Sequence, residues 1–262
     1  MEDIAYILAG FAVGSVVGLT GVGGGSLMTP LLIFGFGIQP ALAVGTDLLF
    51  AAGTKFGGLI HLTRQRLVPW RVVLALCSGS IPASLITIAV LHSVGTQTKD
   101  VQHLMSVTLG GALLLTAAAT LYKVIRGAKL PLQSAVDDSN DQKPRHAAYP
   151  VLFGALIGVL VTLTSVGAGA IGVTVLLILY PRLPLQRIVA SDIAYAVPLT
   201  LVAGLGHASL GTVNWYMLAL LLCGSLPGIW AGSLLVAKAP DRFIRFVLCI
   251  LLTWAGSRLV LN

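Results

Sequence analysis

The sequence predicts an all-α polytopic membrane protein built as two inverted repeats, each a glycine-broken re-entrant helix pair followed by three transmembrane helices. Three observations lead to this prediction: an apolar composition, apolar segments that recur from end to end, and motifs that occur twice in the same order. Of the 262 residues, 56% are hydrophobic and only 10% are charged, and the mean hydropathy is +0.95. Soluble domains carry about a quarter charged residues, so this composition belongs to the membrane class.

Six uninterrupted apolar segments are each long enough to cross a bilayer, which takes roughly 20 residues of helix. In chain order they are residues 41–62, 70–92, 101–125, 185–205, 215–237 and 242–260. Two further apolar stretches, 4–37 and 151–180, are each interrupted by a glycine cluster. We expect these two stretches to form the broken helix pairs.

The basic residues indicate the orientation of the segments. Lys and Arg (16) outnumber Asp and Glu (9), but they gather in short loops, where they mark the cytoplasmic side rather than a nucleic-acid surface. The loop with Arg182 and Arg187 is therefore expected inside, whereas its counterpart at 37–41 is uncharged and expected outside. This difference predicts inverted halves, in which each broken stretch enters and leaves on the same side. The alternative is a single broken span in each half, which would make the repeats parallel.

The repeat itself is the most specific signal in the sequence. The matching motifs lie at a nearly constant offset of about 145 residues, as repeat architectures require. Leu19-Thr20-Gly21-Val22-Gly23-Gly24-Gly25 matches Leu163-Thr164-Ser165-Val166-Gly167-Ala168-Gly169, Thr46-Asp47 matches Ser191-Asp192, His61 matches His207, Trp70 matches Trp215, and Gly79-Ser80-Ile81-Pro82 matches Gly224-Ser225-Leu226-Pro227. We expect a first repeat at 1–126, a polar cytoplasmic linker at 127–148 and a second repeat at 149–262.

The glycine clusters are the candidate substrate site. Paired, interrupted apolar segments in an inverted repeat indicate a transporter whose substrate lies near the membrane midplane at the breaks. Free backbone N–H groups and the helix dipole beyond each break favour an anion. The alternative is close helix packing through small residues. The candidate substrate-binding residues are Thr20, Gly23, Gly24, Gly25, Ser26, Lys55, Thr164, Ser165, Gly167, Ala168 and Gly169.

Asp47, Asp192 and Lys55 are the Asp, Glu and Lys residues well inside the expected spans. Because a charge in the bilayer is costly, each is expected to have a partner and a use. The two aspartates either anchor exposed backbone N–H groups or take up and release protons during transport. Lys55 either attracts the anion or pairs with a carboxylate or carbonyl on another helix.

His61 and His207 end two expected spans, at opposite faces if the halves are inverted. They are interpreted as polar anchors or as a symmetric gate or proton relay. We expect no catalytic residue, no metal ligand and no cofactor, because neither a metal-binding spacing nor a catalytic constellation stands out. Cys77, Cys223 and Cys249 lie in apolar runs and are interpreted as packing residues.

At these positions the sequence resembles the TauE/SafE family, also called the toluene sulfonate uptake permease family, over nearly the whole chain. The resemblance rests on Gly18-Leu19-Thr20-Gly21-Val22-Gly23-Gly24-Gly25 with Pro30, on Ala43-Val44-Gly45-Thr46-Asp47, on the His61 to Trp70 spacing and Gly79-Ser80-Ile81-Pro82, and on Thr164-Ser165-Val166-Gly167-Ala168-Gly169 and Val197-Pro198-Leu199-Thr200. It implies a bacterial inner-membrane carrier that moves sulfite, sulfoacetate, thiosulfate or other sulfonates in either direction. The chain departs from the family pattern at Ala190-Ser191-Asp192, where a Gly-Thr-Asp-like run is expected, and at Pro69 and Asn214, where relatives often have Asp.

These observations together predict a multi-pass secondary transporter of small sulfur-containing anions, proton-linked and working by alternating access. An anion channel with the same glycine-lined site is the alternative, and a membrane-embedded enzyme or receptor is a third. The expected partners are a small anionic substrate and the lipid bilayer, with no nucleic acid; a homodimer is one alternative for the assembly. The identity of the anion, the direction of transport and the coupling ion stay open.

Overall fold

The computed structural model of this chain describes residues 2–20, 25–96, 98–125, 148–167, 169–181, 183–235 and 241–261. All regular secondary structure in these ranges is helical, as the sequence predicts. The first half contains α1 (Glu2–Thr20), α2 (Gly25–Phe36), α3 (Pro40–Arg64), α4 (Trp70–Val94) and α5 (Lys99–Ile125). The second half contains α6 (Ala148–Thr164), α7 (Ala170–Leu179), α8 (Leu185–Ser209), α9 (Trp215–Leu235) and α10 (Asp241–Leu261). The expected linker lies outside the described residues except for Ala148, which begins α6.

Among the described helices, four are long and apolar enough to cross a membrane: Trp70–Val94, Lys99–Leu121, Leu185–Ser209 and Trp215–Leu234. The other two expected spans are helical as well. α3 has 25 residues, but Asp47 and Lys55 lower its mean hydropathy. In α10, the apolar helix among the residues with described side chains is Phe246–Leu261.

The outer surface of the helices is apolar. Large hydrophobic side chains are broadly exposed on several helices, for example Leu74 (64%), Ile86 (65%) and Trp230 (68%). A soluble monomer rarely exposes so much contiguous apolar surface, whereas lipid covers such a surface at no cost. The prediction of a polytopic, all-α membrane protein is therefore confirmed at this level.

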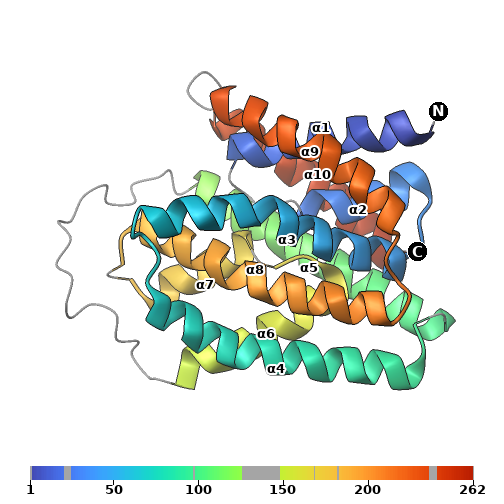
Figure 1. The fold of residues 1–262 in the computed structure, drawn as a ribbon, viewed down its shortest axis with the longest axis horizontal. Coiled ribbons are helices and arrows are strands. Elements are labelled where there is room, and N and C mark those ends of the chain that lie inside the picture. Colours follow the sequence, from blue (N-terminus) through green and yellow to red (C-terminus); the bar gives the residue numbers. More distant parts are fainter. Residues whose placement is uncertain are drawn as a thin grey trace.

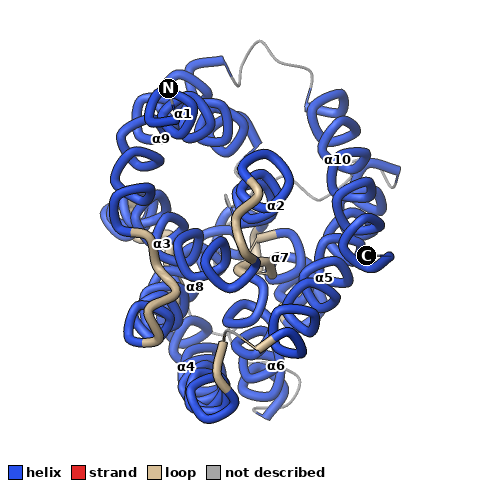
Figure 2. The backbone as a smooth tube through the Cα atoms, turned by 90° about the vertical axis from the view of Figure 1, so that its right-hand side faces the viewer, coloured by secondary structure: helices blue, strands red, loops and turns tan. Residues whose placement is uncertain are grey.

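Helices from the two halves pack against each other in a reciprocal pattern (Figures 1 and 2). α1 packs on α9, and their repeat counterparts α6 and α4 pack in the same way. α3 packs on its own counterpart α8, and α5 packs on its counterpart α10. Each half therefore packs mainly against helices of the other half, and neither forms a helix bundle of its own.

The contacts also give the directions of the paired helices. In the α3–α8 pair, Gly45 faces His207, Leu49 faces Gly204 and Gly58 faces Ile193, so the two helices run antiparallel. In the α5–α10 pair, Gly110 faces Val260, whereas Ala117 O lies 3.6 Å from the sulfur of Cys249, which is again antiparallel. In these two pairs, the equivalent helices of the two halves thus point in opposite directions.

The α1–α9 pair is parallel and very close. Gly10, Gly14 and Gly18 face the backbone of α9 at Leu221, Ser225 and Ile229, so that a β-carbon at any of the three glycines would collide with main-chain atoms. Spacing of small residues by four is the sequence signature of such close crossings in membranes. These glycines therefore allow two helices to pack closely. Their role differs from that of the glycines at the breaks.

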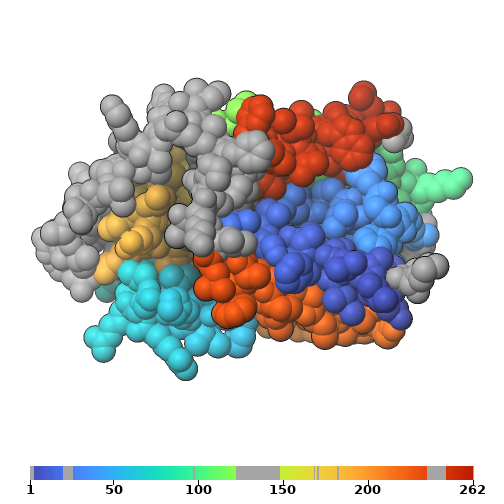
Figure 3. Space-filling view, turned by 90° about the horizontal axis from the view of Figure 1, so that it is seen from above, coloured from blue at the N-terminus to red at the C-terminus, as the bar shows by residue number. Residues whose placement is uncertain are grey.

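The first broken stretch folds back on itself. The ring of Tyr6 near the start of α1 stacks on the ring of Phe36 at the end of α2, with centroids 4.7 Å apart. The two ends of the stretch therefore lie at the same end of the molecule. Viewed end-on, the half-helices α2 and α7 lie toward the middle, with the longer helices around them (Figure 2). Figure 3 shows α2 between α1 and α10 on one face of the molecule, in agreement with the contacts of α2 with both.

Candidate functional site

The second glycine break is described almost completely and has the conformation that its sequence predicts. α6 ends at Thr164 and α7 begins at Ala170. Between them, Gly167 and Gly169 have φ angles of 131° and 139°, which residues with a β-carbon rarely adopt. The N–H groups of Gly172 and Val173 donate to the carbonyls of Gly167 and Gly169, both at 2.9 Å. Carbonyls of the break thus take up two N–H groups near the start of the half-helix.

Thr164 and Ser165, adjacent in the break, use their hydroxyls differently. Thr164 Oγ1 donates to the carbonyl of Leu160 at 2.6 Å and accepts the N–H of Val166 at 3.1 Å, so this hydroxyl holds the break together. Ser165 has a φ of 57°, the left-handed region. Its buried hydroxyl has no partner in hydrogen-bond geometry among the described residues, yet it lies close enough to interact with the carboxylate of Asp47.

Asp47 connects the two breaks. Its carboxylate is fully buried in α3 and accepts a hydrogen bond from Thr29 Oγ1 in α2, the half-helix that follows the first break. The same carboxylate lies next to Ser165, in the second break. One buried carboxylate of the first half therefore contacts both interrupted segments.

Lys55 and Asp192 complete a charged cluster, which we define as Asp47, Lys55 and Asp192. Lys55 interacts electrostatically with both carboxylates, more strongly with Asp192 than with Asp47. Asp192, on α8, is 3% exposed, and Lys55 is partly buried on α3. The interaction between Lys55 and Asp192 thus joins α3 to α8.

Lys55 lies where it can interact with carboxylates of both halves. Along the antiparallel α3–α8 pair, Lys55 lies between the contacts of Leu49 with Gly204 and of Gly58 with Ile193. Its repeat counterpart on α8, the buried Thr200, lies between the same two contacts. The cation is therefore near the middle of the crossing, where the equivalent parts of the two halves meet.

The two histidines lie in different environments. His61 is exposed in the last turn of α3, and its Nε2 lies 2.9 Å from Nε2 of Gln65. His207 is fully buried, with Nε2 2.9 Å from the carbonyl of Thr162 and Nδ1 2.9 Å from Thr212 Oγ1. Because a carbonyl only accepts, Nε2 of His207 carries a hydrogen, and the ring ties α8 to α6. Neither histidine belongs to the charged cluster.

The remaining candidates are placed only in part. Gly25 begins α2, and Ser26 is buried in its first turn. Thr20 ends α1, but its side chain is not described. Gly23, Gly24 and Ala168 lie outside the described residues.

Two residues that the sequence reasoning did not select also contact the site. Thr29, which bonds Asp47, has a counterpart in Thr174 at the offset that relates Asp47 to Asp192. Tyr195 lies one turn after Asp192 and is fully buried. The repeat could have revealed Thr29, and helical spacing from Asp192 could have revealed Tyr195.

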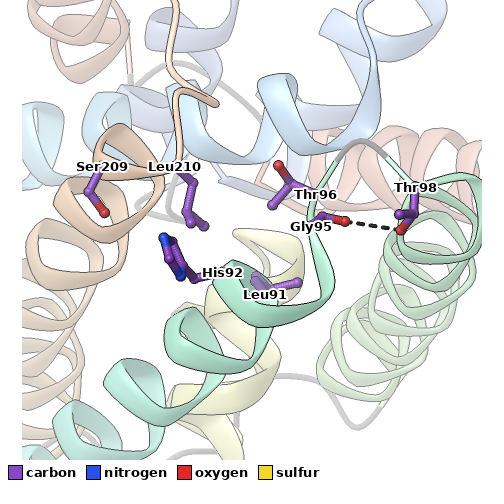
Figure 4. A pocket seen from close by; sticks show the side chains of 7 residues that line it. All are labelled: Leu91, His92, Gly95, Thr96, Thr98, Ser209 and Leu210. Carbon is purple, nitrogen blue, oxygen red and sulfur yellow. Dashed lines mark hydrogen bonds between the residues drawn. The ribbon is translucent and has the colours of Figure 1, made fainter.

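A pocket of about 460 Å³ opens at one end of the bundle, away from the cluster (Figure 4). It is lined by the end of α4, the following loop and the end of α8: Leu91, His92, Gly95, Thr96, Thr98, Ser209 and Leu210. None of these residues belongs to the charged cluster or the breaks. In the described part of the chain, no three His, Cys, Asp or Glu side chains gather as a metal site would require.

Comparison with known proteins agrees with this architecture. The family model described as "Sulfite exporter TauE/SafE" matches residues 6–259. The probable membrane transporter protein YjnA of Bacillus subtilis is 34% identical over 98% of this chain and 100% of its own length. YunE of the same organism is 24% identical over 99% of this chain and 98% of its own length, and MJ0441 of Methanocaldococcus jannaschii is 22% identical over 97% and 94%; both are also named probable membrane transporter proteins. No solved structure matches.

The family match covers both broken stretches and the charged cluster between them, and the resemblance seen in the motifs is thereby confirmed. The chain belongs to the sulfite exporter TauE/SafE family of membrane transporters.

Proposed function

We propose that this protein is a secondary transporter of small sulfur-containing anions, namely sulfite, sulfoacetate or other organosulfonates, or thiosulfate, in the bacterial inner membrane. Transport is proton-linked and proceeds by alternating access of two inverted repeats. The observation that carries the proposal is the charged cluster between α3 and α8, next to both half-helices. The word "sulfite" in the family's description supports the choice of sulfur oxyanions.

Lys55 is the group that attracts the anion. It lies near the middle of the α3–α8 crossing and interacts with the carboxylates of both halves. A cation at this depth in the membrane is energetically costly, and its presence therefore supports a site for a charged ligand. The adjacent breaks supply non-helical backbone, which is tolerated at membrane depth where it lines a site.

The charges in the cluster favour proton coupling. With both carboxylates ionised and the lysine protonated, the cluster has a net charge of −1, and an entering anion meets net repulsion. Two like charges about 4 Å apart repel by about 4 kcal/mol at an effective dielectric constant of 20. Protonation of either Asp47 or Asp192 makes the cluster neutral. The proton and the anion therefore bind favourably together.

The antiparallel packing of equivalent helices supports the inverted topology. If α3 and α8 both cross the bilayer, helices that are repeat counterparts and run in opposite directions must enter from opposite sides. The fold-back of the first broken stretch, seen in the Tyr6–Phe36 stack, supports the re-entrant form of these pairs. Inverted repeats around a central site are the architecture on which alternating access operates.

Purified protein in liposomes tests the proposal. With an imposed proton gradient, we expect sulfite, sulfoacetate or thiosulfate to accumulate above its external concentration, and an uncoupler to abolish this accumulation. Conductance without accumulation would instead indicate an anion channel with the same site. Failure to move any of the three anions, in protein shown to be folded, would contradict the proposed function.

A further inference from the structure

Tyr195 has a buried hydroxyl beside the carboxylate of Asp192. The side chain is 0% exposed in the middle of α8, and its hydroxyl lies close enough to interact with the carboxylate of Asp192 but has no partner in good hydrogen-bond geometry among the described residues. Removing a phenolic hydroxyl from water without replacing its hydrogen bonds costs free energy. A buried hydroxyl in this state needs an explanation, which its surroundings can supply.

The hydroxyl points at the start of the half-helix α7. Tyr195 Oη and Asp192 Oδ1 both lie over Gly172, so closely that a β-carbon at position 172 would collide with the two oxygens. Gly172 lies in the first turn of α7, directly after the second break. The phenol therefore faces the segment where the proposed anion site is located, beside one carboxylate of the charged cluster.

The first half of the chain provides an internal comparison. Phe50 occupies the position equivalent to Tyr195, three residues after Asp47, and it is also fully buried. A phenyl ring thus fills this place without a hydroxyl. Packing alone does not explain the oxygen of Tyr195, which distinguishes the second half from the first.

We propose that Tyr195 is a substrate-binding residue, whose hydroxyl donates a hydrogen bond to an oxygen of the transported anion. The inference rests on the proposed function and assigns the anion contact to the second half of the site. Asp192 is the competing acceptor for the same hydrogen. When Asp192 takes up a proton it loses its charge, and the phenolic hydrogen is then available to the anion.

The test compares Tyr195→Phe with wild type in anion binding and transport. Detergent-purified proteins are titrated calorimetrically with sulfite, sulfoacetate and thiosulfate in turn, and the variant is assayed for uptake in liposomes. We expect Kd and KM to rise about ten- to hundredfold, as for one lost hydrogen bond to a charged group. The melting temperature of the anion-free variant should stay close to that of wild type, because the hydroxyl makes no hydrogen bond of good geometry within the described residues.

Ser80→Ala and Ser225→Ala are the matched controls. Their hydroxyls are also buried and without a partner among the described residues, but they lie at the α4–α6 and α1–α9 contacts. Both controls should bind the anion as wild type does. A Tyr195→Phe variant with unchanged Kd, or one that only loses thermal stability, overturns the inference and leaves the proposed function standing. Wild type that binds none of the three anions overturns both.

Discussion

At the scale of single residues, position in the repeat does not determine environment. His61 and His207 match in sequence, but one is exposed at a helix end and the other is buried with both ring nitrogens near polar partners. Thr164 is a candidate ligand, and its hydroxyl bonds the backbone on both sides of the helix end. The sequence identified these positions because polar residues inside apolar runs are conspicuous. It could not assign their partners, which come from other helices.

The histidine pair gives a direct comparison. His207→Ala removes the contacts with Thr162 and Thr212 and leaves a buried carbonyl without its donor, which costs about 1–3 kcal/mol. His61→Ala changes an exposed side chain and should alter stability by less than about 0.5 kcal/mol. Thermal unfolding in detergent measures both. Equal loss of transport in two well-folded variants would instead favour the symmetric gate.

Thr29→Val tests the anchoring of Asp47. The substitution keeps the shape of the side chain but removes the hydrogen bond that the Thr29 hydroxyl donates to a buried carboxylate, so we expect a loss of about 1–3 kcal/mol in the free energy of unfolding. Thr29→Ser retains a hydroxyl and should recover most of that loss. If the valine variant is as stable as wild type, Thr29 does not anchor Asp47.

At the scale of the helices, the apolar periods and glycine clusters located the elements well. The expected spans at 70–92 and 185–205 correspond to α4 and α8, which begin at the same residues and end at Val94 and Ser209. α3 was also expected, although Asp47 and Lys55 lower its mean hydropathy. The pairing of α1 with α9 and of α6 with α4 could not be derived from hydropathy, because an apolar face indicates burial and not the partner. The Gly10, Gly14 and Gly18 series is the signal that could have indicated a close crossing.

Gly14→Ala tests that crossing. A β-carbon here would meet the backbone of α9 at Ser225, and overpacking of this kind costs about 1–3 kcal/mol. Gly111→Ala is the control: it lies in α5 with no atom within 4 Å of the added β-carbon, and it should gain up to about 1 kcal/mol from helix propensity. Melting temperatures that shift in the same direction for both variants would contradict the packing role.

At the scale of the whole molecule, the account depends on two halves that are inverted and share one charged cluster. The sequence predicted the inversion from a few loop charges, and the antiparallel α3–α8 and α5–α10 pairs support it through independent contacts. It did not predict that Lys55, which has no charged counterpart, lies near the crossing of the halves. If a two-fold axis relates the two halves, a residue close to that axis can interact with both of them, and no second lysine is needed.

Cysteine labelling tests the inversion. Arg64 at the end of α3 and Ser209 at the end of α8 are repeat equivalents, and both are exposed. In a background without Cys77, Cys223 and Cys249, Arg64→Cys should react with an impermeant thiol reagent only from the cytoplasmic side and Ser209→Cys only from the outside. Labelling of both from one side would indicate parallel repeats.

The charged cluster is the central claim, and sulfite uptake by Lys55→Thr in liposomes tests it most directly. Threonine is the residue that the second half has at the matching position, so the variant makes the crossing symmetric and removes the cation. Lys99→Thr, an exposed lysine at the start of α5, is the control. We predict that proton-driven sulfite accumulation falls at least a hundredfold in Lys55→Thr and is unchanged in Lys99→Thr. Wild-type accumulation by folded Lys55→Thr protein would contradict the account.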